Sequence, residues 1–206
     1  MLIICFLSVV LNAPFAAEVQ TAYAQQDTEA LRTLLDQASA QEDSFLVRYR
    51  LYPLTEDASL LEDLPSDLNR GTAREYALLS GLWSYKAGEA SLLHVIQYGR
   101  RSKKLLDEAT SRDPGDPYVL LVQGQSLLFR PAIAGRDPAA AAARFEELAT
   151  HVDSVSGISE LEANVWCWLA LQEAGQAQRA ATLHEDLLQQ DLPPLYRQFL
   201  EDPPDV

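Results

Sequence analysis

The sequence predicts an all-α protein of about nine or ten helices, arranged as a string of antiparallel helical hairpins. Three observations support this fold class. Apolar and polar residues do not alternate over any sustained stretch, so strand signals are almost absent. Leu and Ala, which favour helix, dominate the chain, and apolar residues recur at spacings of three and four. Glycines and prolines interrupt this pattern at short intervals, which indicates short connections between helices.

The first part of the chain after residue 25 contains the weaker helix signals. Asp27 is a favourable N-cap for a helix that runs to about Ala38. A second, short helix covers Phe45 to Leu51, and we expect Pro53 to end it because the residue before a proline disfavours the helical conformation. Residues 54–70 are mixed and predict at most a turn or two of helix.

The rest of the chain contains stronger helices with clear breaks. Gly88 separates the first two, and the proline- and glycine-rich run 113–117 is a turn. Pro131 stops the next helix, and Asp137 followed by Pro138 restarts helix with an N-cap and a proline at the first position. The helices predicted in this part cover residues 72–87, 90–112, 118–129, 137–152, 160–174, 178–190 and 195–201.

The N-terminus has the features of a secretory signal peptide. Residues 2–11, LIICFLSVVL, are uncharged and apolar, but this run is shorter than the roughly 20 residues that a membrane-spanning helix needs. Ala22 and Ala24 place small residues at the two positions that a signal peptidase reads. We therefore expect a signal peptide over residues 1–24, cleaved after Ala24, and an exported protein, periplasmic or secreted. No Lys or Arg precedes the apolar run, so a buried N-terminal helix is the alternative interpretation.

The charge balance disfavours two classes of partner. The 206 residues include 30 acidic and 16 basic side chains, for a formal net charge of −14. A nucleic-acid-binding protein needs the opposite sign, because contacts to phosphates dominate its affinity. An anionic membrane surface is disfavoured for the same reason. We therefore expect no nucleic acid among the partners of this chain, and the shortness of the apolar run predicts no stable membrane span.

Small residues recur at spacings that are typical of a known helical repeat. Gly81 and Gly88 stand seven residues apart, Gly175 is followed five residues later by Ala180, and Gly124 precedes a helix with an alanine and a phenylalanine. This pattern resembles the tetratricopeptide repeat (TPR), in which a small residue lies where paired helices cross. The resemblance implies a right-handed α-solenoid of TPR-like hairpins over residues 71–206, closed by a C-terminal capping helix. Residues 25–70 would form an N-terminal helical segment.

A loop in the middle of the chain adds a more specific resemblance. Pro131, Gly135, Asp137, Ala141 and Phe145 are similar to a loop of divergent bacterial TPR-like proteins of the cell envelope. Subunits associated with periplasmic TRAP transporters share this general build. Arg136 replaces the second glycine of the loop pattern. The resemblance covers roughly residues 72–192 and implies a scaffold without catalytic residues.

No pattern of residues points to catalysis, to a cofactor or to a metal. The three histidines lie on three different predicted helices, and Cys167 sits between two tryptophans in an apolar stretch. Zinc needs several convergent ligands, which these isolated residues do not supply. Phosphate-binding glycine loops and dinucleotide fingerprints are absent from the sequence. We therefore expect a protein that is not an enzyme and that needs no cofactor.

Two sets of residues are candidates for binding. In the TPR register, six positions face the groove, although Tyr85 and Phe129 could instead fill the core between hairpins. The basic cluster in the 90–112 helix is either a solvated flank or a docking patch for an acidic partner. The groove candidates are Glu75, Tyr85, Lys86, Tyr118, Gln125 and Phe129, and the basic cluster is Arg100, Arg101, Lys103 and Lys104.

The leading hypothesis is therefore a non-catalytic, exported scaffold that binds another protein or a peptide. Arrays of helical hairpins present extended concave surfaces that suit this role. The alternative hypothesis is a small-molecule-binding or transporter-accessory periplasmic protein. An apolar pocket left unfilled by side chains would favour the alternative.

Overall fold

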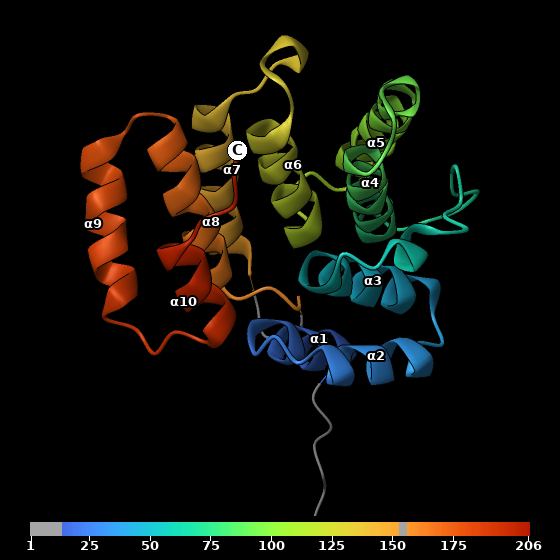
Figure 1. The fold of residues 1–206 in the computed structure, drawn as a ribbon, viewed down its shortest axis with the longest axis horizontal. Helices are drawn as coiled ribbons and strands as arrows, with labels where there is room; N and C mark the ends of the chain where they lie inside the picture. Colours follow the sequence, from blue (N-terminus) through green and yellow to red (C-terminus); the bar gives the residue numbers. More distant parts are fainter. Residues whose placement is uncertain (1–13, 153–155) are drawn as a thin grey trace, which may run out of the picture.

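The computed structural model describes residues 14–152 and 156–206, and over these residues the chain forms ten α-helices and no strand (Figure 1). The predicted all-α class and the predicted number of helices are confirmed. The α-helices are α1 (Phe15–Ala24), α2 (Thr28–Gln37), α3 (Gln41–Thr55), α4 (Ala73–Gly88), α5 (Leu92–Arg112), α6 (Pro117–Phe129), α7 (Pro138–His151), α8 (Glu160–Glu173), α9 (Ala177–Leu188) and α10 (Pro194–Glu201). Two short 3₁₀ helices, η1 (Ala58–Leu61) and η2 (Ala132–Ala134), lie in the connections.

Side-chain caps determine where several helices begin. The Asp27 carboxylate accepts a hydrogen bond from the backbone N–H of Ala30 at 2.9 Å, as the sequence predicts for α2. Asp137 caps α7 in the same way, with Pro138 at the first helical position. The N-terminus of α4 has a complete capping box, in which Thr72 and Glu75 each accept a hydrogen bond from the other's backbone N–H. Such caps satisfy N–H groups that have no partner within the helix.

The prediction that Pro53 ends its helix is wrong. Helix α3 begins four residues before Phe45 and continues through Pro53 to Thr55. The proline lies in the last turn, where its missing N–H removes only one hydrogen bond of the helix. The helix ends instead at Glu56, which adopts a left-handed conformation (φ 52°) and donates its backbone N–H to the carbonyl of Tyr52.

Consecutive helices pack against each other as hairpins, and the hairpins pack side by side. The pairs α2–α3, α4–α5, α6–α7 and α8–α9 are in contact, and α4 also contacts α3 and α6 (Figure 1). Helix α10 packs against α8 and against α1, so that the two ends of the described chain meet. The handedness expected for a TPR-like array stays a prediction.

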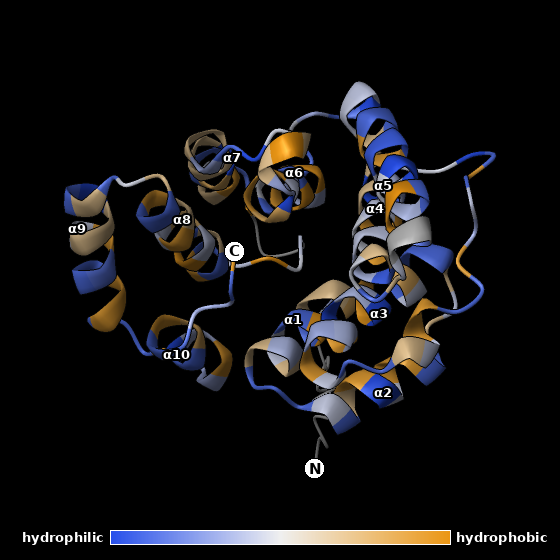
Figure 2. Cartoon of the chain, turned by 45° about the horizontal axis from the view of Figure 1, so that its top comes forward, coloured by the Kyte–Doolittle hydropathy of each residue, from blue (hydrophilic) through white to orange (hydrophobic). Residues whose placement is uncertain are grey.

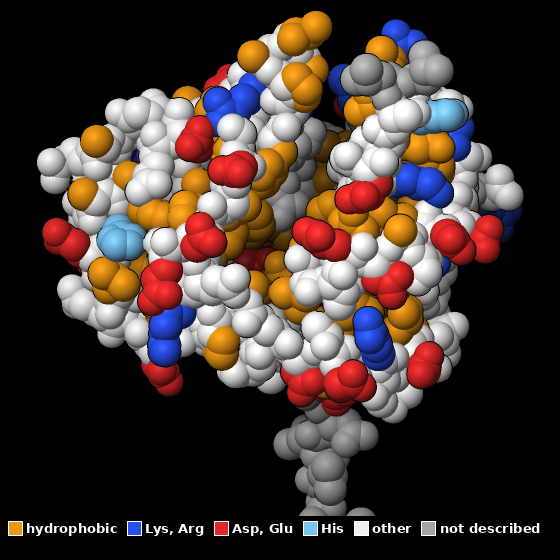
Figure 3. Space-filling view, in the orientation of Figure 1, with side chains coloured by type: hydrophobic (Ala, Val, Ile, Leu, Met, Phe, Trp, Pro, Cys, Tyr) orange, Lys and Arg blue, Asp and Glu red, His pale blue; other side chains and the backbone are white. Residues whose placement is uncertain are grey.

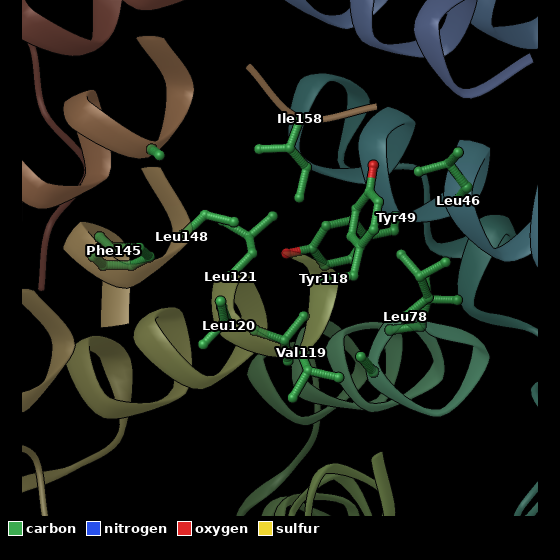
Figure 4. Packing of buried hydrophobic residues seen from close by; sticks show 14 of the residues in the cluster. Leu46, Tyr49, Leu78, Tyr118, Val119, Leu120, Leu121, Phe145, Leu148 and Ile158 are labelled. Carbon is green, nitrogen blue, oxygen red and sulfur yellow. The ribbon is translucent and has the colours of Figure 1, made fainter. Parts of the chain in front are cut away.

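The buried apolar side chains form one cluster that draws on every part of the described chain, from Val19 in α1 to Leu200 in α10. In α2 and α9 hydrophilic and apolar residues follow one another along the helix (Figure 2), and the buried residues of these helices are apolar: Leu31 and Leu34 in α2, Ala180 and Leu187 in α9. The close view in Figure 4 shows side chains of α3, α4, α6 and α7 meeting in this cluster. Residues 25–70 therefore share their core with the rest of the chain.

The two glycines predicted at helix crossings lie at two different kinds of contact. Gly124 faces the partner helix of its own hairpin, as predicted, because a Cβ at this position would lie 2.5 Å from Cζ of Phe145 in α7. Gly81 faces α3 of the preceding hairpin, where a Cβ would lie 2.5 Å from Cε2 of Tyr49. The small residue at the α4–α5 crossing is instead Ser80, whose hydroxyl donates to the backbone carbonyl of Ser102 at 2.8 Å.

Candidate functional site

The candidate site is a hollow between α6 on one side and α3 and α4 on the other. Figure 3 shows hydrophobic side chains on the walls of this hollow and acidic side chains around its rim. The helices on both sides contribute buried side chains to the apolar cluster. Because this packing fixes the positions of the helices, the hollow has rigid walls. Rigid, largely preformed concave surfaces with apolar walls are the usual setting of binding sites.

Aromatic rings from three helices form a ladder that begins at the C-terminal end of α6. Phe129 is 42% exposed, and its ring meets that of Trp166 in α8 edge-on, with centroids 5.9 Å apart. Trp166 in turn contacts Phe199 of α10 at 4.8 Å. Trp166 and Phe199 are only partly buried. Aromatic pairs of this geometry hold each other in place, so the ladder offers a rigid, partly exposed apolar surface.

The predicted groove residues Tyr85 and Gln125 meet through Tyr49 of α3. The Tyr49 ring stacks on Tyr85 with centroids 5.5 Å apart, and its hydroxyl donates to the Gln125 side-chain oxygen. Tyr52, about one turn after Tyr49 in α3, also stacks on Tyr85, with ring centroids 4.8 Å apart. Gln125 lies one turn before Phe129 on the same helix, so both face the same way. The structure therefore brings three of the six predicted groove residues together, but Tyr85 is already held between two other rings.

Tyr118 does not line a groove, which corrects the sequence prediction. Its side chain is fully buried and points from α6 toward Tyr49 (Figure 4). Its hydroxyl donates to the backbone carbonyl of Gly157 at 3.0 Å and accepts a hydrogen bond from Arg50 at 3.3 Å. The TPR register predicts exposure from a residue's position along α6 alone. Residues 156–158 and α3 lie outside the repeat pattern, and they cover the first turn of α6.

Glu75 and Lys86 also fall outside the hollow. Glu75 belongs to the capping box of α4, where its carboxylate accepts the backbone N–H of Thr72 at 2.8 Å. Lys86 turns toward the other side of α4, where its ammonium group donates to the carbonyl of Leu61 at 2.7 Å and lies 5.3 Å from the centre of the Trp83 ring. Both side chains are therefore occupied by local structural contacts.

The basic cluster lies on the outer side of α5 and is partly neutralised. Lys103 pairs with Asp107 at 2.6 Å, and Lys104 pairs with Asp67 at 2.5 Å. The Arg101 guanidinium lies over the Trp83 ring, 4.7 Å from its centre. A shallow, open depression of about 490 Å³ lies on this face and is lined by Ile96, Gln97, Arg100, Arg101 and Lys104. Because two of the four cations are paired, Arg100 and Arg101 supply most of the charge available to an acidic partner.

Trp166, Phe199 and Tyr49 are residues of the site that the sequence reasoning missed. Trp166 and Phe199 lie in helices far from α6 along the chain, and each has the spacing of an ordinary core residue. Tyr49 lies in the segment 25–70, which the repeat pattern does not cover. Their role depends on which helices meet in space, and a single sequence carries no signal of such contacts.

Comparison of the chain with known protein families, with curated proteins and with solved structures finds no match. The resemblance to TPR-like envelope proteins consequently rests on the sequence patterns alone and stays a prediction.

Over residues 14–152 and 156–206, no three His, Cys, Asp or Glu side chains lie close enough together to hold a metal ion. Within the same residues, every helix is too short or too polar to cross a bilayer. The apolar run at residues 2–11, with Cys5, lies outside the described residues.

Cys167 is buried in α8, next to the backbone of α7, and we expect it to be unreactive in the folded protein. Burial raises the pKa of this thiol to about 12, so almost no thiolate, the reactive form, exists at pH 8. Iodoacetamide at pH 8 should leave Cys167 unmodified in the native protein and label it fully in guanidinium chloride. Peptide mass mapping distinguishes it from Cys5. Rapid labelling of native Cys167 would contradict this assignment.

Proposed function

We propose that the protein is a non-catalytic, exported scaffold of TPR-like build that binds another protein or a peptide across α6, from the hollow beside α3 and α4 to the aromatic ladder that leads to α8 and α10. The observation that carries this proposal is the partly exposed aromatic ladder that begins at Phe129. Large aromatic side chains supply much of the binding energy at protein interfaces. Gln125, whose side chain is held by Tyr49, supplies a fixed polar group beside the ladder that can orient a bound chain.

The charge of the chain indicates what kind of segment fits. Acidic side chains surround the hollow (Figure 3), and the net charge of the chain is −14. Complementary charge speeds association and excludes wrong partners. The partner that fits best therefore presents apolar side chains for the aromatic ladder and Lys or Arg for the rim.

Phe129→Ala tests this proposal. Phe129 is nearly half exposed, so we expect the variant to lose little thermal stability, while recovery of partners from envelope extracts should fall at least tenfold. Ile133→Ala is the matched control, because Ile133 is 97% exposed in η2 and outside the ladder. Tyr85→Ala is less informative, since its stacking on two tyrosines makes a loss of stability the expected result.

The outcomes of this experiment separate the two candidate surfaces. If Phe129→Ala retains full binding and Arg100→Glu with Arg101→Glu abolishes it, the basic face of α5 is the docking surface and the hollow is not. The small-molecule or transporter-accessory alternative stays a prediction. The depression on α5 and the one at the α8–α9 contact are both open to solvent, whereas a small-molecule site usually encloses most of its ligand.

A further inference from the structure

Helix α1, which lies within the segment 1–24 expected to be removed as a signal peptide, is built into the core of the protein. Val19 is 0% exposed, and Ala22, Tyr23 and Ala24 are also buried. The helix contacts α2, α3 and α10. Its buried side chains thus face three helices from both ends of the chain, as those of an integral core element do.

Residues elsewhere in the chain depend on the presence of α1. The Arg50 guanidinium lies over the Tyr23 ring, 4.6 Å from its centre, and the Gln20 amide donates to the Tyr196 hydroxyl at 2.6 Å. Gly157 has a φ of +73°, and a Cβ there would lie 2.8 Å from the Cβ of Ala16 and 2.9 Å from its carbonyl oxygen. Glycine is therefore required at position 157 partly because α1 approaches its backbone so closely.

The expected cleavage site lies inside a regular helix terminus. Gln25 donates its backbone N–H to Thr21, and the two following residues form the paired hydrogen bonds of a Schellman motif, from Gln26 to Tyr23 and from Asp27 to Ala22, each at 2.9 Å. Gln26 adopts the left-handed conformation that this motif requires, with a φ of 56°. The Ala24–Gln25 bond thus joins α1 to α2 through a tight, hydrogen-bonded turn.

From these contacts we infer that residues 15–24 are a permanent part of the folded protein, and that any N-terminal processing takes place upstream of Phe15. The inference is independent of the proposed binding function. It is compatible with export, but it replaces cleavage after Ala24, which the small residues at positions 22 and 24 predict. In the structure both alanines are buried in the apolar cluster, and two small buried residues at this spacing produce the same pattern as a signal peptidase site.

A matched pair of substitutions on α1 tests the inference in the mature protein that the host makes from the full-length gene. Val19→Ala removes two buried methyl groups and should lower Tm by about 3 °C or more, whereas Thr21→Ala, at an exposed position of the same helix, should change it by about 1 °C or less. If α1 is removed during maturation, both variants yield the same mature chain and melt identically, which would overturn the inference.

Intact-mass measurement of the protein recovered from its host completes the test. A first residue at or before Phe15 supports the inference, and a mature protein that begins at Gln25 refutes it. The same measurement, made on separate cell fractions, tests export separately from the fate of α1. A protein found only in the cytosol with Met1 in place would refute export but would support the inference, because α1 is then retained.

Discussion

Replacing Arg50 with methionine should destabilise the protein by about 3–5 kcal/mol, because it leaves a buried carboxylate without its partner. Arg50 in α3 pairs with Glu162 in α8 at 2.5 Å, and both side chains are almost completely buried. The guanidinium also donates to the Gly157 carbonyl at 3.2 Å. Burial by itself, the largest single influence, would lower the pKa of Arg50, but the Glu162 carboxylate together with Tyr118 and Tyr23 more than offsets it and raises the pKa well above its usual value, so the guanidinium stays charged.

The double variant Arg50→Met with Glu162→Met distinguishes two contributions to the free energy of unfolding. One is the cost of leaving the Glu162 carboxylate buried without a partner, and the other is the net contribution of the ion pair. Buried ion pairs exchanged for apolar residues of similar volume often leave stability unchanged or increase it. We therefore expect the double variant to recover most of the stability that Arg50→Met loses, as measured by urea unfolding with an unchanged m-value. If the double variant is as unstable as the single one, packing around Arg50, rather than the unpaired charge, accounts for the loss.

The ion pair also illustrates which parts of the fold a single sequence predicts. Helix periodicity, the N-caps at Asp27 and Asp137 and the breaks at glycine and proline are local features, and the helices they predict are present. Arg50 and Glu162 are 112 residues apart, and in the sequence each looks like an ordinary charged helix residue. Their pairing depends on α3 and α8 meeting in space, which local patterns do not encode.

In the candidate site, too, local features follow from the sequence and long-range contacts do not. Gln125 and Phe129 lie on one face of α6, and the spacing of one helical turn predicts this from sequence. Tyr118 lies seven residues before Gln125, close to the same face, but it is buried because residues 156–158 and α3 cover the first turn of α6. A repeat register describes one helix against its neighbours in the repeat, so segments outside the repeat can cover positions that the register exposes.

Gly124→Leu should destabilise the protein by about 3 kcal/mol, near the upper end of the usual range for overpacking. Helices α6 and α7 approach so closely that a Cβ at position 124 would lie within 2.5 Å of two atoms of the Phe145 ring. Phe145 is completely buried and stacks on Trp166 at 5.9 Å, so it cannot move aside without disturbing the aromatic ladder. Thermal or urea unfolding measures the loss.

Gly99→Leu is the matched control for this substitution. Gly99 is an exposed glycine within α5, and a Cβ added there would have no neighbouring atom within 4 Å. The same change therefore removes the conformational freedom of glycine without a clash, and we expect it to stabilise the protein by about 0.5–1 kcal/mol.

A second-site change distinguishes steric conflict from any other effect at position 124. Phe145→Ala alone should cost about 3–5 kcal/mol through the cavity it leaves, but combined with Gly124→Leu the new side chain fills part of that cavity. The double variant should therefore be more stable than the sum of the two single losses predicts. Strict additivity would show that Gly124 and Phe145 are not in contact, and that the α6–α7 hairpin crosses at another position.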